Sequence, residues 1–214
     1  MRYIPLAEKM RPGRIEDVVG QEHVLGSGKL ITSLIKNKQP FSLIFWGPPG
    51  SGKTTLARII ATEIEAEFIE ISAVTAGKKD VLKVVEDAGV NQRLGQRTVL
   101  FVDEIHRFNK SQQDAFLPHV ESGLITLIGA TTENPSFEII NPLLSRSRVI
   151  VLKPISKENF VKLIKRTIKQ EGLKESRINK DAIDMLAEIS AGDARVALGT
   201  LELAIELSGN KKID

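Results

Sequence analysis

One glycine-rich segment contains the residue types and the spacing that bind phosphate groups. It matches the pattern G-x-x-x-x-G-K-[ST] and reads Gly47-Pro48-Pro49-Gly50-Ser51-Gly52-Lys53-Thr54. Its glycines let consecutive backbone N–H groups face an anion, and a helix starting near Lys53 points its positive dipole end at that anion. Lys53 would neutralise oxygens of the β- and γ-phosphates, and the Thr54 hydroxyl would be a ligand of Mg²⁺. The segment predicts a site for ATP and Mg²⁺ that extends to Thr55.

The alternative to a phosphate site is a chance match on a glycine turn. With glycine at roughly 7% of residues, a random chain of this length would show the fixed positions well under about 1% of the time. The motif also requires a strand before the loop and a helix after it. An apolar run at Phe41–Trp46 and a helical pattern at Lys53–Ile64 meet that requirement.

Two adjacent carboxylates follow a second apolar run. Asp103 and Glu104 come directly after Thr98–Val102. In an open α/β sheet, ligands bind at the carboxyl ends of the strands, so these acids are expected beside the phosphate loop. Asp103 would be a ligand of Mg²⁺, and Glu104 would polarise the attacking water as the general base. Taken alone, two acids at a strand end more often form a solvated turn, and the phosphate loop favours the catalytic interpretation.

Five apolar runs predict strands, and they alternate with helical patterns. Strands are expected at Phe41–Trp46, Phe68–Ile71, Val99–Val102, Leu124–Ala130 and Arg148–Leu152, and helices at Lys53–Ile64, Lys79–Ala88 and from a cap at Ser111 and Asp114 to about Val120. This alternation is typical of βαβ units in a mostly parallel sheet that is covered on both faces. The leader Met1–Gly28, which contains prolines and glycines, is expected to be mostly irregular.

The pattern changes after Pro154, where the strand signals stop. Helical periodicity runs through Ser156–Gln170, Lys180–Ile189 and Asp193–Leu207. We therefore expect an α/β fold of the P-loop NTPase type, in which helices flank a parallel sheet over residues 1–153. A small all-helical lid domain is expected over residues 154–214.

Composition and charge narrow the class of protein. The chain has 42% hydrophobic and 27% charged residues, which suits a globular protein with a core. It has no run of 18 apolar residues, no apolar core of a signal peptide and no cysteine, so a cytoplasmic protein without disulfides is expected. A net charge of +3 and a pI near 9.1 permit nucleic acid as a partner without requiring it.

The two motifs together resemble those of AAA+ ATPases, in particular the clamp-loader and RuvB branch. The phosphate loop has the form GPPGSGKT, and the acids occur in the form VDEIH. The resemblance implies ATP hydrolysis within an oligomer. It also gives roles to residues outside the motifs: adenine contacts to Arg11, Pro12, Val18 and Val19, the sensor-1 position to Thr132, the arginine finger to Arg146 and the sensor-2 arginine to Arg195. The finger would act on the nucleotide of a neighbouring subunit.

Longer strings resemble one family of this branch, the replication-associated recombination proteins. They lie at 71–80, 103–114 and 130–137. This resemblance implies a DNA-dependent ATPase that acts at stalled forks, gaps or junctions in replication, recombination and repair. Its implied partners are single-stranded, gapped or forked DNA, single-strand DNA-binding protein and replisome components at the nucleoid. Family members are longer and form tetramers through a C-terminal helical region, so this chain is expected to be a core fragment.

Two other functions compete with this one. A RuvB-like branch-migration motor would require a winged-helix module after the lid, and bacterial clamp-loader motor subunits usually carry a zinc-binding set of cysteines. A nucleotide-binding scaffold that no longer hydrolyses ATP belongs to a different class. Such a scaffold would be expected to lack Lys53, Glu104 or Arg146, and all three are present.

Several polar side chains near the motifs have more than one interpretation. Arg148 is an alternative to Arg146 as the finger, and Asn134 is an alternative to Thr132 as the sensor. A structural or coupling role is expected for His106, because a single histidine without further ligands is poor evidence for a metal site. Trp46 is expected in the core. The cations Lys162, Lys165, Arg166 and Lys169 share an amphipathic helix and predict a solvated face.

Overall fold

A computed structural model describes residues 3–174, 177–209 and 211–214 of the chain. The chain divides into two compact units. Unit 1 consists of Met1–Gln21, Pro48–Gly52 and Lys153–Asp214, and unit 2 consists of Glu22–Gly47 and Lys53–Leu152. Within the described ranges, no helix has the length and apolar character needed to cross a membrane.

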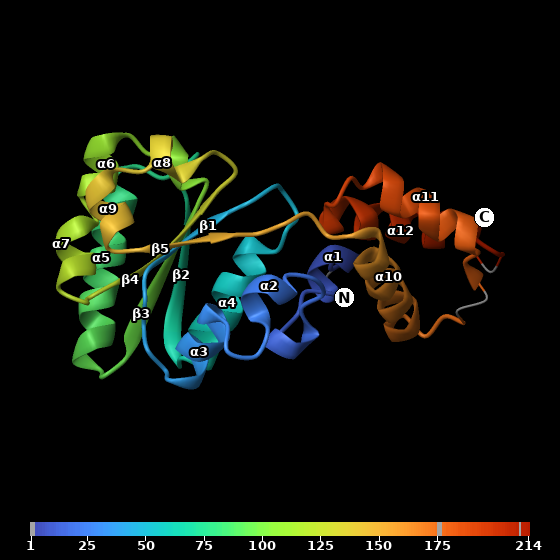
Figure 1. Ribbon diagram of the computed structural model, residues 1–214, viewed down its shortest axis with the longest axis horizontal. Coiled ribbons are helices and arrows are strands. Elements are labelled where there is room, and N and C mark those ends of the chain that lie inside the picture. Colours follow the sequence, from blue (N-terminus) through green and yellow to red (C-terminus); the bar gives the residue numbers. More distant parts are fainter. Residues whose placement is uncertain (1–2, 175–176, 210) are drawn as a thin grey trace. The chain divides into compact units, whose positions relative to one another are not determined.

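Unit 2 is built on a five-stranded parallel sheet (Figure 1). Its strands are β1 (Leu43–Trp46), β2 (Ala66–Ser72), β3 (Arg97–Asp103), β4 (Thr126–Thr131) and β5 (Arg148–Val151), in the order β2-β3-β4-β1-β5. The predicted parallel sheet is confirmed. Because all five strands run the same way, their carboxyl ends meet at one edge of the sheet.

Helices on both faces of the sheet explain why its central strands are continuously apolar. Residues 99–102 of β3 and 43–45 of β1 are fully buried. The helices α3 (Leu30–Lys36) and α4 (Lys53–Glu63) cover one face, and α5 (Lys78–Arg93) to α9 cover the other (Figure 1). The remaining helices of unit 2 are α2 (Glu22–Leu25), η2 (Ile105–Arg107), α6 (Lys110–Asp114), α7 (Leu117–Glu121), α8 (Pro135–Glu138) and α9 (Asn141–Ser145).

The predicted helix to about Val120 is wrong in its start and in its continuity. The structure has two short helices there, α6 and α7. The N-cap is Asn109 and not Ser111, because the Asn109 side chain accepts from the Gln112 N–H at 2.9 Å while the Gln112 side chain accepts from the Asn109 N–H at 3.0 Å. This reciprocal pair satisfies two N–H groups at the start of the helix. The patterns did not predict the short helices α2, α3, α8 and α9.

Three longer helices form the main part of unit 1. They are α10 (Lys157–Gln170), α11 (Lys180–Ile189) and α12 (Ala194–Ser208), close to the predicted ranges. Each begins after a capping side chain, from Ser156, Asn179 and Asp193 respectively. Their role as a lid and the domain division at residue 153/154 remain predictions.

The leader is more ordered than expected, and its part up to Gln21 belongs to unit 1. It contains the helix α1 (Leu6–Lys9) and the 3₁₀ turn η1 (Ile15–Asp17). Leu6 and Met10 are buried in one apolar cluster with residues of α10, α11 and α12. Arg166 donates to the backbone carbonyl of Asp17 at 2.7 Å and pairs with its carboxylate at 3.2 Å. Arg166 therefore belongs to a tether between the leader and α10, in contrast to the solvated face predicted for it.

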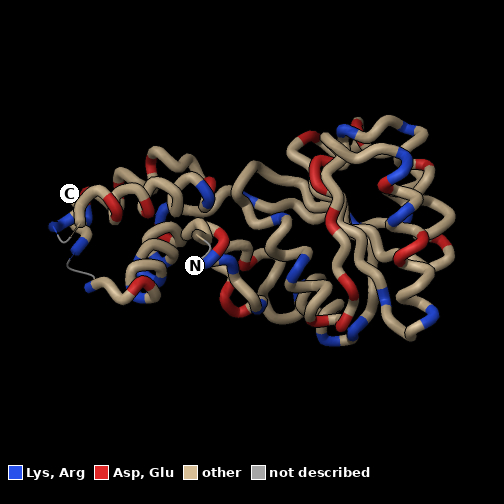
Figure 2. The backbone as a smooth tube through the Cα atoms, turned by 180° about the vertical axis from the view of Figure 1, so that it is seen from behind, with Lys and Arg blue, Asp and Glu red and all other residues tan. Residues whose placement is uncertain are grey.

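Charged residues of both signs are distributed through each unit. Lysine and arginine segments alternate with aspartate and glutamate segments along the chain (Figure 2). The alternation accords with 30 basic and 27 acidic residues and a net charge of +3. Charge alone therefore identifies no partner, and the functional argument rests on local geometry.

Candidate functional site

The phosphate loop has the backbone geometry that its glycines predicted. Gly50 and Gly52 have φ angles of +68° and +96°, a region that residues with a Cβ rarely adopt. At Gly50, a Cβ would also lie 2.0 Å from an Asp193 side-chain oxygen. Glycine at this position is therefore required both by the backbone and by the close approach of Asp193.

Lys53 is the first residue of α4 and is held inside the motif. Its side-chain Nζ donates to the Gly47 carbonyl at 2.7 Å, and the residue is 8% exposed. The Gly47 N–H in turn donates to the Thr131 carbonyl at 3.2 Å, which anchors the start of the loop to β4. A Cβ on Gly47 would lie 2.6 Å from the Leu152 carbonyl oxygen. Thr54 and Thr55 follow Lys53 on α4 and are half-buried.

The residues of the loop suit a triphosphate and its metal ion. The Ser51 hydroxyl is buried and has no hydrogen-bond partner among the described residues. Buried polar atoms without partners are rare in native proteins, and a missing ligand is one of their explanations. Within unit 2, the Lys53 ammonium, the Thr54 hydroxyl and the N-terminus of α4 are a donor set whose chemistry fits an anion with bound Mg²⁺.

The two acids lie at the carboxyl end of β3, with a strained backbone at the second. Asp103 is the last residue of the strand and is half-buried. Glu104 has φ +52° and ψ +45°, a left-handed conformation that costs a non-glycine residue about 1 kcal/mol or more. Such strain persists only where neighbouring contacts fix the residue. The Glu104 backbone is therefore held in one orientation as the chain turns from β3 into η2.

Two side chains, those of His106 and Thr132, contact the Glu104 carboxylate. Its Oε2 lies 3.2 Å from Nδ1 of His106 and accepts from the Thr132 hydroxyl at 3.5 Å. The same His106 nitrogen lies 3.0 Å from the Thr131 hydroxyl. Thr132 therefore contacts Glu104, and its role as the sensor remains a prediction. Asn134, the competing sensor candidate, instead caps α8 by accepting from the Ser136 N–H at 3.0 Å.

The order of the strands brings the acids and the lysine to the same edge. β4 is the only strand between β3 and β1 in the described sheet, and it pairs with both. Two strand spacings separate the end of β3 from the end of β1, which is about 10 Å. Asp103 and Glu104 therefore lie across one strand from Lys53, with Thr132 following the strand in between.

The two candidate finger arginines lie in different surroundings. Arg146 ends α9 and is exposed, where it pairs with Glu121 and donates to the Pro142 carbonyl at 3.0 Å. Arg148 begins β5, opposite Leu43 at the amino end of β1, and its guanidinium lies 5.7 Å from the centre of the Phe41 ring. The two side chains thus belong to a helix end and to the amino edge of the sheet respectively.

Unit 1 brings leader residues, part of the phosphate loop and the start of α12 together. Gln21 donates to the carbonyls of Ser51 at 3.3 Å and Lys153 at 2.7 Å. Asp193 caps α12 by accepting from the Arg195 N–H at 2.8 Å. Its carboxylate also lies 3.6 Å from the exposed Arg195 side chain. The four leader residues predicted to contact adenine, Arg11, Pro12, Val18 and Val19, are all half-buried in this unit.

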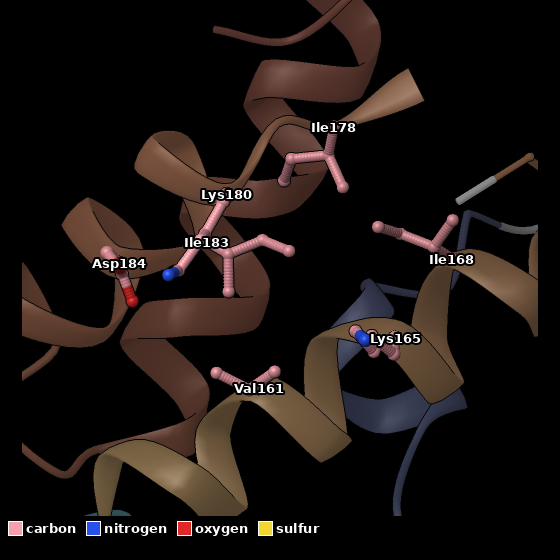
Figure 3. A pocket seen from close by; sticks show the side chains of 7 residues that line it. All are labelled: Val161, Lys165, Ile168, Ile178, Lys180, Ile183 and Asp184. Atoms are coloured by element: carbon pink, nitrogen blue, oxygen red, sulfur yellow. The ribbon is translucent and has the colours of Figure 1, made fainter. Parts of the chain in front are cut away.

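A separate pocket of unit 1 involves none of the predicted site residues. It lies between α10 and α11, where the side chains of Val161, Ile168, Ile178 and Ile183 line an apolar floor (Figure 3). Its other lining residues are Lys165, Lys180 and Asp184. The pocket lacks the glycine turns and the unpaired hydroxyl that mark the phosphate loop, so it is not the nucleotide site predicted from the sequence.

The site includes contacts that the patterns did not identify. His106 contacts both Glu104 and Thr131, and only a structural or coupling role is expected for it from the sequence. Gln21 was given no role of its own. Gly20 and Gln21 have positive φ angles of +80° and +66°, and this conformation is visible only in the structure.

This chain is similar to known proteins over nearly its whole length. The family model of the ATPase family associated with various cellular activities (AAA) matches residues 43–155. Replication-associated recombination protein A of Haemophilus influenzae is 49% identical over 98% of this chain and 49% of that protein, and the ATPase WRNIP1 of Dictyostelium discoideum is 47% identical over 95% of this chain and 24% of that protein.

Among solved structures, the Thermotoga maritima RuvB Holliday junction branch migration motor is similar with a TM-score of 0.75. The two chains are 27% identical, over 96% of this chain and 69% of the other. The present chain spans about half the length or less of the curated relatives named above. The family model covers more than half of the 214 residues, and this chain belongs to the AAA family of ATPases.

Proposed function

We propose that this chain binds ATP together with Mg²⁺ and hydrolyses it to ADP and phosphate. The observation that carries the proposal is the juxtaposition of Lys53 and the acid pair Asp103–Glu104 at one edge of a single parallel sheet. A phosphate-binding loop and a carboxylate base at that spacing are the parts that phosphoryl transfer to water requires.

Each residue of the site has a distinct task in this proposal. The loop N–H groups and Lys53 bind and orient the phosphates. Thr54 and Asp103 would hold Mg²⁺, which when bound neutralises negative charge on the phosphate oxygens. Glu104 takes a proton from water as the water oxygen bonds to the γ-phosphorus and the bond to the bridging oxygen of ADP breaks. Thr132 donates to the same carboxylate and orients it.

Two arginines complete the proposed site from different places. Arg146, exposed at the end of α9, is proposed as the finger that acts on the nucleotide of a neighbouring copy. Such fingers stabilise the charge that develops in the transition state. Arg195, at the start of α12, is proposed as the arginine that senses the γ-phosphate. The first role requires assembly into a homo-oligomer, and a tetramer is the state that the family resemblance implies.

The biological role that we propose is ATP-driven work on DNA in replication-associated recombination and repair. The names of the similar proteins support it, since one is a replication-associated recombination protein and another is a branch migration motor. Replication forks, gaps and junctions are the proposed DNA substrates, with single-strand DNA-binding protein and replisome components as proposed partners. A scaffold that binds nucleotide without hydrolysis is the alternative, and the intact base and lysine argue against it.

The experiment that tests the function is Glu104→Gln, which keeps the shape of the side chain but removes the base. We expect ATP binding to be retained, while turnover falls by about 10²-fold or more. Glu86→Gln, on the exposed face of α5, is the matched control and should behave as the wild type. Binding is measured by titration with a fluorescent ATP analogue and turnover by phosphate release. Normal turnover in Glu104→Gln would exclude Glu104 as the base.

A further inference from the structure

His106 lies where a hydrogen-bonding group can control the orientation of Glu104. It belongs to the 3₁₀ turn η2, which directly follows the two acids, and its side chain is 8% exposed. A histidine that merely filled the core would need one hydrogen-bond partner and no particular one. His106 instead directs a single ring nitrogen, Nδ1, toward both Glu104 and Thr131, at 3.2 and 3.0 Å.

The partners of Nδ1 restrict which of them can donate. A carboxylate only accepts hydrogen bonds, so the contact with Glu104 requires a hydrogen on Nδ1. The Thr131 hydroxyl already accepts from the Glu133 N–H at 3.0 Å and donates to the Glu133 carbonyl at 3.2 Å. With its own hydrogen directed at Glu133, the hydroxyl meets Nδ1 as an acceptor. An N–H on Nδ1 thus lies within donating distance of both oxygens, 3.2 Å from Glu104 and 3.0 Å from Thr131, and can be shared between them.

The position of Nδ1 between these two oxygens couples the proposed base, Glu104, to the end of β4, which precedes the proposed sensor. Thr131 is the last residue of β4 and is fully buried, and Thr132 follows it as the proposed sensor. Thr132 and His106 both reach the same oxygen of Glu104, Oε2. Both contacts are made to one oxygen, which leaves Oε1 as the oxygen that would take the proton from water.

We propose that His106 is a positioning residue that links the end of β4 to Glu104. The inference rests on the proposed function, since it assigns a role relative to the base of ATP hydrolysis. A shift of Thr131 toward or away from Nδ1 changes how much of the shared N–H is donated to Glu104. A movement of Thr131 would thereby change the orientation of the Glu104 carboxylate. Removal of the His106 side chain would leave Glu104 misoriented, while nucleotide would still bind.

The test compares three changes that remove or retain the shared N–H. His106→Ala removes it, His106→Asn places an amide N–H near the position of Nδ1, and Thr131→Val removes the partner hydroxyl at nearly constant volume. We expect kcat to fall about 10- to 100-fold in His106→Ala, with KM and ATP affinity within about twofold of the wild type. His106→Asn should recover most of the loss. His119→Ala, on α7, is the matched control.

A double-mutant cycle distinguishes coupling from separate effects. If His106 and Thr131 act as one unit, His106→Ala with Thr131→Val should reduce kcat no further than His106→Ala alone. The inference is overturned if the two effects multiply, if His106→Asn fails to recover activity, or if affinity falls in parallel with kcat. Thermal unfolding identifies a variant that does not fold, in which case His106→Asn and Thr131→Val decide the outcome.

The same measurements separate failure of this inference from failure of the proposed function. If Glu104→Gln is inactive while the His106 variants turn over ATP normally, Glu104 stands as the base and His106 has no positioning role. If Glu104→Gln turns over ATP normally, the proposed function itself fails. If both Glu104→Gln and His106→Ala lose kcat while ATP binding is retained, both assignments are supported.

Discussion

The carboxyl edge of the sheet in unit 2 and the start of α12 in unit 1 differ in how they hold their polar side chains. At the sheet edge, Glu104 is half-buried and is contacted by His106 and Thr132. At the start of α12, the Arg195 side chain is 68% exposed, and its contact with Asp193 is at 3.6 Å. One region therefore holds its polar group between neighbouring side chains, whereas the other leaves it exposed to solvent.

This difference indicates that the sheet edge is suited to control turnover, and that the start of α12 is suited to control nucleotide affinity. A general base must be held within a fraction of an ångström of its productive position, which a sheet edge with buried neighbours provides. A long exposed arginine loses rotamer freedom when it contacts a ligand, so it suits recognition of a bound phosphate. Changes at the sheet edge should therefore lower kcat, and changes at the start of α12 should lower affinity.

The largest expected effect comes from Arg146→Ala, which extends the comparison to a third region, the exposed end of α9. In an assembled oligomer, turnover should fall about 10³-fold with ATP binding retained, because the finger acts on charge in the transition state. Phosphate release is the measurement, and mixing Arg146→Ala with Lys53→Ala subunits should partly restore it. Arg148→Ala, which removes a contact with Phe41, is the comparison variant. If it alone abolishes turnover, the finger is Arg148.

An intermediate effect is expected from Arg195→Ala. Loss of one charged hydrogen bond to a phosphate should weaken ATP binding about tenfold, with kcat changed less than the affinity. ADP, which lacks the γ-phosphate, should bind to Arg195→Ala nearly as well as it binds to the wild type. Arg93→Ala, exposed in the last turn of α5, is the control. If kcat fell while ATP affinity stayed constant, the division of roles between the two regions would be wrong.

The smallest expected effect comes from Gln21→Ala, which removes the tether of the phosphate loop within unit 1. Gln21 is buried, donates to Ser51 and Lys153, and accepts from the Lys153 N–H at 3.0 Å. Its loss should lower the free energy of unfolding by about 1 kcal/mol, measured by chemical denaturation. Gln21→Ala keeps a Cβ at the positive φ angle, so its loss measures the side-chain hydrogen bonds. In Gln21→Gly, relief of the backbone strain should offset part of that loss, and an unchanged free energy of unfolding in Gln21→Ala would show that these hydrogen bonds do not stabilise the fold.

Much of the fold was predictable because its strands are buried on both faces. Continuous apolar runs at 99–102 and 124–130 gave β3 and β4 to within a few residues. The three longer helices of unit 1 were predictable from their amphipathic periodicity. The short helices were not, because four to seven residues carry too little periodicity to stand out from a loop. Asn109 was missed as a cap because its partner Gln112 lies inside a run of polar residues.

By itself, the sequence determined which chemical groups are adjacent along the chain. Glycines, a lysine and a threonine in one loop predict a phosphate site because its donors are nearly consecutive, and two acids after an apolar strand predict a metal ligand and a base. The tertiary structure decided what no local pattern contains. The placement of β4 between β3 and β1 sets the distance from the acids to Lys53, and the turn after Asp103 brings His106 back to Glu104 and Thr131. Contacts of that kind depend on strand order and burial, which arise only when the whole chain packs.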